Sequence, residues 1–203
     1  MTYDVLIIGA GAAGLSCALV LGSANNREYV SNKTIGIIAH QKNSHLHNAL
    51  FNNVLGFKPG TTGASILKTG ISQLQTLYPH INQIKKEKVL AINKQDAIFI
   101  VDTNKNQYES KIVVIAAGYT NLLTIKGLDS YIEAHPRSVK EKQRIWLRNT
   151  DHLVDAGLYV AGTLAGWRSQ FSIAAGSGAH VATDILTAWN GGKHTKVHDK
   201  AGA

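Results

Sequence analysis

A glycine-rich turn between a strand and a helix constrains this chain more than any other feature. Residues 3–8 form an apolar run of strand length, interrupted only by Asp4, and an alanine-rich helical pattern follows the glycines directly. Gly9 permits a tight turn, Gly11 lets the backbone approach a pyrophosphate, and Gly14 lets helix and strand pack closely. Phosphates then face a helix N-terminus, which favours anions. The sequence therefore predicts a dinucleotide site, and its context disfavours a glycine turn without a ligand.

Composition narrows the class of protein. With 203 residues the chain can form one substantial core. Cys17 is its only cysteine, which excludes both an intramolecular disulfide and a C-x-x-C redox pair. We expect this thiol to pack as a small apolar group rather than to react. The net charge of +8 is spread along the chain apart from 85–88 and 137–148, so it favours anionic ligands or an acidic partner. No nucleic-acid motif is present, and no nucleic-acid binding is predicted.

The apolar N-terminus does not resemble a signal peptide. No basic residues precede it, and glycines interrupt it. No apolar run reaches membrane-spanning length. We therefore expect a cytoplasmic protein without membrane contact.

The second strand, predicted at 34–39, is followed by unusual residues at the position that commonly contacts a ribose. Dinucleotide-binding folds commonly place an acidic residue there, whereas this chain has His40 and Gln41. Either side chain can hydrogen-bond a ribose without carrying a negative charge. Glu28 precedes the strand, so it is not expected to take this role.

A segment rich in Asn and His follows, from 40 to 56. It contains His45 and His47, but neither a cysteine nor a cluster of carboxylates lies beside them. A metal site is therefore not predicted, and we interpret the segment as a loop beside a cofactor. A helix is predicted at 64–78, where Pro79 ends it.

The pattern then changes to short strands. Strands predicted at 81–84, 88–92, 97–101 and around Tyr108 read as an inserted antiparallel meander. A separate buried strand, 111–118, ends in small residues.

The last part of the chain returns to an α/β pattern. Residues 119–155 show no clear period and are predicted to be a connection with at most one short helix. A buried strand is expected at 158–162 and a helix at 170–189. Residues 191–203 are predicted to form a flexible tail.

Three segments together resemble the thioredoxin-reductase-like, FAD-dependent pyridine nucleotide-disulfide oxidoreductase family. They are Gly9-x-Gly11-x-x-Gly14, Ile115-Ala116-Ala117-Gly118, and 157–163 with the helix 170–178. The resemblance implies an α/β, Rossmann-like, three-layer FAD-binding fold, in which a central parallel sheet carries helices and an inserted antiparallel β-meander. Residues 1–190 would form a single FAD-binding domain, in which a connection at 121–154 joins segments 1–120 and 155–190 where full-length relatives have an NADPH domain.

The resemblance also implies the cofactor, FAD, and positions that would contact it. Adenine would lie against 88–90, and the last helix would point its N-terminus at the flavin ring. His45 and His47 are candidate proton carriers, with a purely structural loop histidine as the alternative. The cofactor-binding candidates are Gly9, Gly11, Ala12, Ala13, Gly14, His40, Gln41, Asn43, His47, Val89, Ala116, Ala117, Gly118, Gly162, Thr163, Arg168, Gln170, Phe171 and Ser172.

Departures from the family pattern limit the function. Only 43 residues separate Gly118 from Gly162, too few for a nucleotide-binding domain. Thr163 stands where the family has Asp, and no dithiol exists. The leading hypothesis is an FAD-dependent oxidoreductase that exchanges electrons with a diffusible substrate, dioxygen or a protein partner. The alternative is a non-catalytic FAD-binding sensor or a subunit of a larger redox complex; NAD binding without FAD is disfavoured. Family analogy implies a homodimer.

Overall fold

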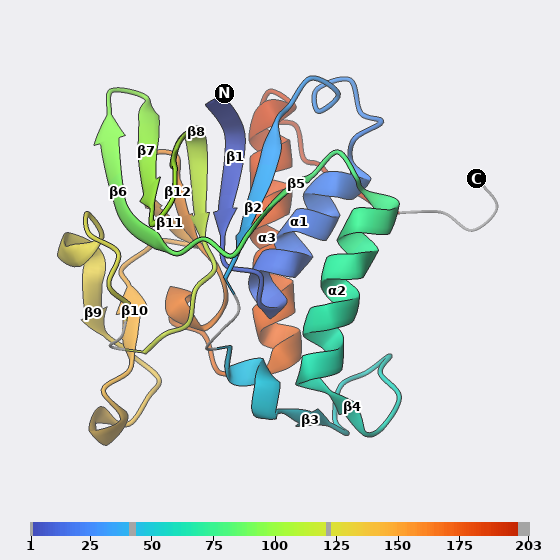
Figure 1. The fold of residues 1–203 in the computed structure, drawn as a ribbon, viewed down its shortest axis with the longest axis vertical. Coiled ribbons are helices and arrows are strands. Elements are labelled where there is room, and N and C mark those ends of the chain that lie inside the picture. Colours follow the sequence, from blue (N-terminus) through green and yellow to red (C-terminus); the bar gives the residue numbers. More distant parts are fainter. Residues whose placement is uncertain (1, 41–43, 121–122, 199–203) are drawn as a thin grey trace.

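The computed structural model describes residues 2–40, 44–120 and 123–198 and is built around one eight-stranded sheet. Five of its strands run parallel in the order β12-β8-β1-β2-β5 (Figure 1). The central strands β1 and β2 are nearly continuous apolar runs because both of their faces are buried. The strand bounds are β1 Thr2–Ile8, β2 Ile35–Ala39, β5 Asn82–Lys85, β6 Val89–Gln95, β7 Ile98–Thr103, β8 Gln107–Ile115, β11 Leu153–Asp155 and β12 Leu158–Val160.

Strand β8 joins the parallel sheet to the antiparallel meander. Its first half pairs antiparallel with β7, through Ser110 opposite Phe99, and its second half pairs parallel with β12, through Val113 opposite Leu158. The sequence suggested two pieces here, but a single long strand serves both neighbours. The expectation that 81–84 begins the meander was also wrong, because β5 pairs parallel with β2.

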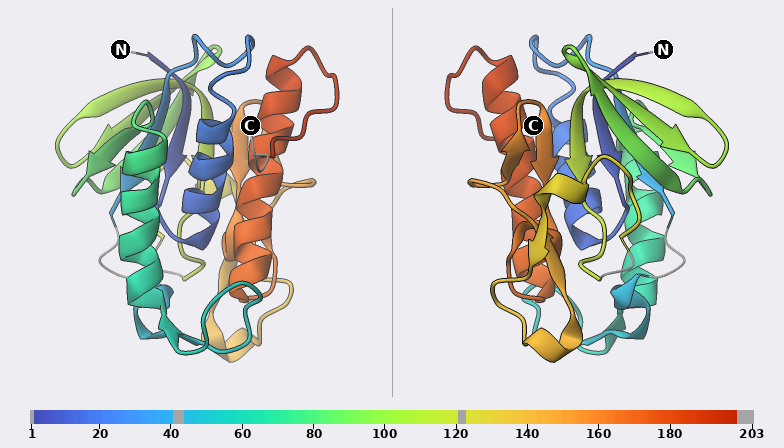
Figure 2. Two further views of the ribbon diagram at one scale, coloured as in Figure 1. Left: turned by 90° about the vertical axis from the view of Figure 1, so that its right-hand side faces the viewer. Right: turned by 90° about the vertical axis from the view of Figure 1, so that its left-hand side faces the viewer.

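Three helices cover one face of the parallel sheet. They are α1 (Ala12–Ser23), α2 (Gly63–Leu77) and α3 (Phe171–Trp189), as Figure 2 shows from two sides. Thr62 caps α2, because the Ser65 N–H donates to its hydroxyl oxygen over 3.2 Å. These helices agree closely with the periodicity read from the sequence.

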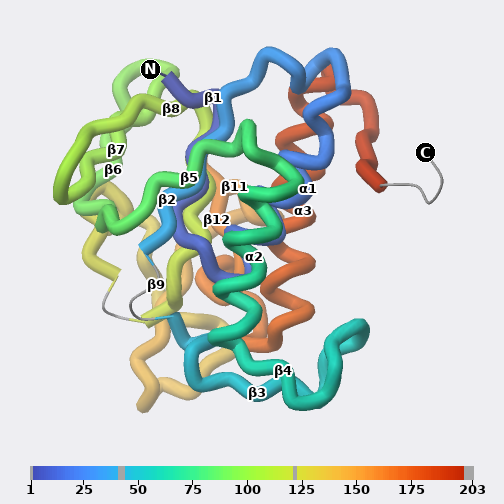
Figure 3. Tube along the Cα trace, turned by 45° about the vertical axis from the view of Figure 1, so that its right-hand side comes forward, coloured from blue at the N-terminus to red at the C-terminus, as the bar shows by residue number. Residues whose placement is uncertain are grey.

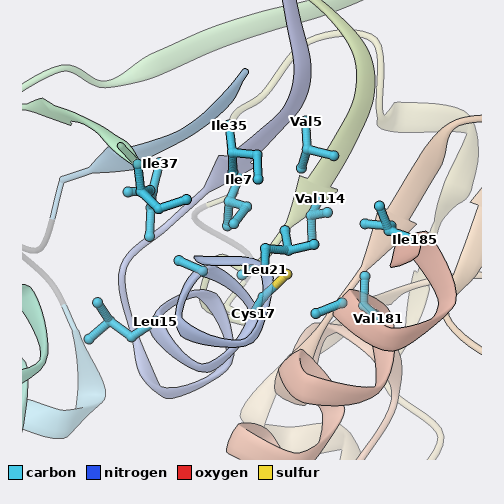
Figure 4. Close-up of a cluster of buried hydrophobic side chains, with 14 of the residues drawn as sticks. Val5, Ile7, Leu15, Cys17, Leu21, Ile35, Ile37, Val114, Val181 and Ile185 are labelled. Atoms are coloured by element: carbon cyan, nitrogen blue, oxygen red, sulfur yellow. The ribbon is translucent and has the colours of Figure 1, made fainter. Parts of the chain in front are cut away.

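The core under the helices is formed by aliphatic side chains of β1, β2, β8, α1 and α3. Figure 4 shows this cluster, in which Cys17 lies among the aliphatic groups. Burial raises the pKa of the Cys17 thiol to about 12. The labelled members are Val5, Ile7, Leu15, Cys17, Leu21, Ile35, Ile37, Val114, Val181 and Ile185.

A second core covers the opposite face of the sheet. There Leu6 and Ile8 of β1 pack with Phe99 and Val101 of β7 and with residues of the 125–165 region. The order helices, parallel sheet, meander gives three layers. The predicted fold class, an α/β Rossmann-like domain with an inserted meander, is confirmed.

The connection between the meander and the last strand has more structure than the sequence suggested. It contains a hairpin of β9 (Ile132–Ala134) and β10 (Ile145–Leu147), with the short 3-10 helices η2 (Asp129–Tyr131) and η3 (Lys140–Lys142). The prediction of one short helix missed the hairpin because each strand is only three residues long.

The segment between β2 and α2 lies beyond the carboxyl ends of the parallel strands. It contains η1 (His45–Asn48), β3 (Leu50–Phe51) and β4 (Thr61–Thr62), and Figure 3 traces it below the sheet. Open α/β sheets bind ligands at this end of their strands. The fold therefore places the segment rich in Asn and His where a ligand would lie.

Part of the segment predicted to be a flexible tail packs against the core. Thr195 is buried, its N–H donates to the Thr187 hydroxyl over 3.2 Å, and Val197 contacts the helix-side core. Residues 199–203 lie outside the described ranges. Within those ranges, no helix combines the length and the apolar character needed to cross a membrane.

Candidate cofactor-binding site

A cavity of about 450 Å³ lies at the carboxyl ends of the central strands. Its volume falls within the range of about 300–1,000 Å³ typical of small-molecule sites. The predicted site residues that line it are Gly9, Gly11, Ala12, Ala13, His40, His45, Val89, Ala116, Ala117, Gly118, Gly162, Thr163, Gln170 and Phe171.

Four of the predicted residues that the structure describes do not line this cavity. Gly14 packs against the Gly9 carbonyl beneath it, while His47, Arg168 and Ser172 are exposed outside it. Gln41 and Asn43 lie outside the described residues.

The glycine turn is held tightly against the neighbouring strand. Gly9 has a φ of +107°, and a Cβ atom on it would meet the carbonyl group of Ala116. Gly11 is the N-cap of α1, and nothing lies within 4 Å of where its Cβ would be. The first N–H groups of a helix have no intrahelical acceptor. The N-cap is glycine and the first turn contains no acidic residue, so no side chain caps this end of the helix. Its free N–H groups can therefore bind an external anion.

The far end of the cavity lies beside the meander. Glu87, Lys88 and Val89 line it, and His40 faces it from the end of β2. Glu87 accepts hydrogen bonds from the Thr103 hydroxyl over 2.7 Å and the Asn106 amide over 2.8 Å. Burial raises the pKa of Glu87, but these donors and the Tyr108 hydroxyl outweigh it and hold the pKa below its usual range. Glu87 thus holds the segment that precedes β6 in place, a role that its sequence context did not indicate.

At the opposite end of the cavity, Tyr119 belongs to the lining and contacts residues from the loop of the β9–β10 hairpin. The Tyr119 ring lies 5.9 Å from the His45 ring and 5.4 Å from the His135 ring, and the Arg144 guanidinium lies 4.9 Å from the Tyr119 ring centre. The His135 Nε2–H donates to the Thr163 carbonyl over 3.0 Å, a tautomer fixed by the Arg137 N–H, which donates to Nδ1. Sequence reasoning missed these residues; the only signal was the cluster of basic residues at 137–148.

The N-terminus of α3 forms one wall of the same end. Its N-cap is Gln170, whose side chain makes no capping hydrogen bond, and its first turn contains no acidic residue. Phe171 packs between Phe51 and Phe57, with ring centres 5.3 and 5.0 Å away. These aromatic contacts hold the β3 segment against the helix end.

The residues present fit a flavin dinucleotide. Two helix N-termini without side-chain caps line the same cavity, and each can stabilise negative charge, one on a pyrophosphate and the other on an electron-rich ring. Most of the remaining lining is apolar, which suits planar rings.

Comparison with known proteins gives the family. Residues 3–167 match the model of the pyridine nucleotide-disulphide oxidoreductase family. The chain belongs to this family. It is 31% identical over 122 residues to a ferredoxin–NADP reductase of Streptococcus thermophilus, covering 57% of this chain and 34% of that protein. A thioredoxin reductase of Treponema pallidum is 32% identical over 117 residues, with 57% and 35% covered. The chain thus spans about a third of the length of these curated relatives.

Solved structures show the same fold. An oxidoreductase from Agrobacterium tumefaciens superposes with a TM-score of 0.72 at 14% identity, covering 93% of this chain and 98% of that one. A ferredoxin-flavin thioredoxin reductase from Clostridium acetobutylicum superposes with a TM-score of 0.69 at 19% identity, covering 94% and 99%. These likenesses show that the chain shares the fold of these proteins.

Proposed function

We propose that the chain binds FAD in this cavity and acts as a flavoprotein oxidoreductase that exchanges electrons with an external carrier. The observation that carries the proposal is the single cavity that runs from the N-terminus of α1 to the N-terminus of α3. A family of flavoproteins whose glycine motif heads α1 supports the same assignment.

Each part of the cavity has a role in this proposal. The first turn of α1, from Gly11 to Ala13, holds the pyrophosphate. His40 hydrogen-bonds the ribose, and Val89 packs against the adenine. The N-terminus of α3 stabilises negative charge on the ring. When bound, FAD supplies the transfer of one or two electrons, while the chain supplies orientation and electrostatics.

His45 is the proposed proton carrier beside the ring. It lines the cavity and stacks edge-on against Tyr119, whereas His47 of the same short helix lies outside the lining. An imidazole can take up or release a proton near neutral pH. The structure therefore favours His45 over His47 for this role.

We further propose that the electron partner is a small acidic protein. The chain cannot form a redox dithiol, because it has only one cysteine, and that cysteine is buried. Between 137 and 148, in the β9–β10 hairpin and its loop, there are five basic side chains and one acidic one, and this loop packs against Tyr119 of the cavity lining. Several relatives are named ferredoxin–NADP reductases, which act with a protein carrier by their printed names.

The test is spectroscopic. Purified protein, reconstituted with excess FAD and freed of unbound cofactor, should show a flavin spectrum with about one FAD per chain, and FMN should not compete. Anaerobic addition of reduced ferredoxin should bleach this spectrum faster than NADPH does. Bleaching by NADPH alone would show that the electron donor is a nicotinamide and not a protein carrier. Absence of any reducible flavin would overturn the proposal that the chain is a flavoprotein. Light scattering of the same sample checks the predicted homodimer.

A further inference from the structure

A second cluster of polar groups lies outside the cofactor cavity, between a tight turn and α3. Asp151 Oδ1 lies 3.6 Å from His152 Nδ1 and 3.5 Å from His180 Nε2. These three ligand atoms all lie within 4.8 Å of one another. Asp184, one turn along α3, places Oδ2 3.3 Å from His180 Nε2. The cluster joins residues about 30 positions apart, so sequence spacing alone gave no metal-binding signal.

His152 is the buried member, and it is oriented into the cluster. Its side chain is 4% exposed, and its Nδ1 atom has no hydrogen-bond partner among the described residues. Its other ring nitrogen, Nε2, lies 2.8 Å from the Ser177 hydroxyl. A buried polar atom without a partner is costly and requires an explanation. An ion at the cluster would satisfy Nδ1.

The backbone that presents Asp151 and His152 is unusual. Thr150 and Leu153 exchange two backbone hydrogen bonds of 2.9 Å around a two-residue turn, in which Asp151 and His152 have φ values of 46° and 72°. Turns with two positive φ angles favour residues such as Asn-Gly. Here two side chains with ligand atoms occupy these positions, and both are directed toward α3.

We propose that Asp151, His152 and His180 bind a divalent first-row transition-metal ion, of which Zn²⁺ is the natural probe. Two imidazoles and a carboxylate suit zinc and its neighbours better than Mg²⁺ or Ca²⁺. Ligands about 2.0–2.1 Å from a tetrahedral zinc lie about 3.3–3.4 Å apart, close to the distances of 3.6 and 3.5 Å from Asp151 Oδ1 to the two imidazole nitrogens. Asp184 or a water completes the coordination.

The surroundings of His152 suit a metal ligand. A histidine that binds a metal through Nδ1 donates its Nε2–H to a second partner, and the Ser177 hydroxyl oxygen occupies that position. Burial, with His180 nearby, lowers the pKa of His152. The Trp167 ring stacks on the other side at 6.0 Å between centres.

The ion would link the 150–153 turn to α3. One side chain, Ser177, would connect its ligand His152 to the cofactor cavity. The Ser177 hydroxyl also accepts the Gly162 N–H over 2.7 Å, and Gly162 lines the cavity. This proposal does not rest on flavin binding, so each can fail separately.

Zinc binding to untagged, metal-depleted protein tests the proposal, measured by competition with a chromogenic chelator. The wild type should bind one Zn²⁺ per chain, and His180→Gln should weaken binding at least about tenfold. His180 lies on the surface of α3, so the variant should fold as judged by circular dichroism. Asp151→Asn, which suits the positive-φ turn, is a second ligand variant. His80→Asn, an exposed histidine away from the cluster, is the matched control and should bind zinc like the wild type.

The unfolding temperature provides an independent readout. Zinc should raise it for the wild type and His80→Asn, and much less for His180→Gln and Asp151→Asn. Equal zinc affinity in wild type and His180→Gln, or less than one zinc per chain at saturation, would overturn the proposal.

Discussion

At the scale of one residue, substitutions of Gly11 can distinguish helix capping from anion binding. With a φ of −84° and open space around its Cβ position, this N-cap accepts Asp or Asn without strain. Both side chains should leave stability unchanged or slightly raised. In Gly11→Asp the carboxylate faces the proposed pyrophosphate, where like charges about 5 Å apart repel by about 3 kcal/mol at an effective dielectric constant of about 20. FAD affinity, measured by fluorescence quenching, should therefore be about a hundredfold lower in Gly11→Asp than in Gly11→Asn. Equal affinities would place the phosphates elsewhere.

The thiol of Cys17 should be unreactive in the folded protein. Because burial raises its pKa to about 12, almost no thiolate exists at pH 8. The native protein should not react with a thiol-specific disulfide reagent over minutes, whereas protein in denaturant should titrate one thiol per chain. Rapid stoichiometric reaction of the native state would contradict the buried position in the α1 core.

The contact between α1 and α3 depends on Gly178 at the scale of elements. A Cβ atom there would meet the backbone of Ala13, which lines the cofactor cavity. Gly178→Ala must push the helices apart, and we expect a loss of about 1–3 kcal/mol in unfolding free energy together with weaker FAD binding. Gly176→Ala is the matched control, since nothing lies within 4 Å of its Cβ position. It should stabilise the helix by about 0.5–1 kcal/mol. Denaturant unfolding of both variants decides the point, and equal effects would show that the helices are not in close contact.

The start of β1 is tied to its neighbours by Asp4. Its carboxylate accepts the Thr34 N–H and the Lys111 ammonium, each over 2.9 Å. Burial raises the pKa of Asp4, but these two partners outweigh it, so the folded pKa lies below the usual value. The stabilisation is therefore complete above the unfolded pKa of about 4 and is lost as the pH falls through the folded pKa. Asp4→Asn should cost about 1 kcal/mol at pH 7 and less at pH 3. Parallel stability curves from pH 3 to pH 7 would contradict this contribution.

Elements with a strong local signal could be predicted from the sequence, and the others could not. The glycine turn, β2 and the three helices each carry several consistent residues, so their periodicity or turn chemistry identified them. The β9–β10 hairpin has three-residue strands whose partners lie across a loop, and only tertiary contacts define it. β8 was divided in the prediction because its two halves face different neighbours and therefore differ in burial pattern.

The same reason limits prediction of the site at the scale of the whole molecule. The parts of the site that are formed by the backbone, such as Gly9 and the end of β8, can be predicted from motifs in continuous sequence. His135 and Arg144 contact Tyr119, which lines the cavity, only because the hairpin folds back toward it. Asp151 and His180 come together through the packing of α3 against the turn, which no sequence spacing records.

The charge distribution over the molecule predicts how the proposed acidic carrier docks. Lys142 is exposed in η3 beside the hairpin, whereas Lys68 is exposed on α2, on the opposite side of the sheet (Figure 1). Lys142→Glu and Lys68→Glu change the net charge equally, so a difference between them reports position rather than total charge. At low ionic strength Lys142→Glu should slow stopped-flow reduction by ferredoxin several-fold, and Lys68→Glu should have little effect. The difference should shrink near 1 M salt, where the Debye length is about 3 Å. Equal rates for both variants at low salt would place the docking surface away from the hairpin.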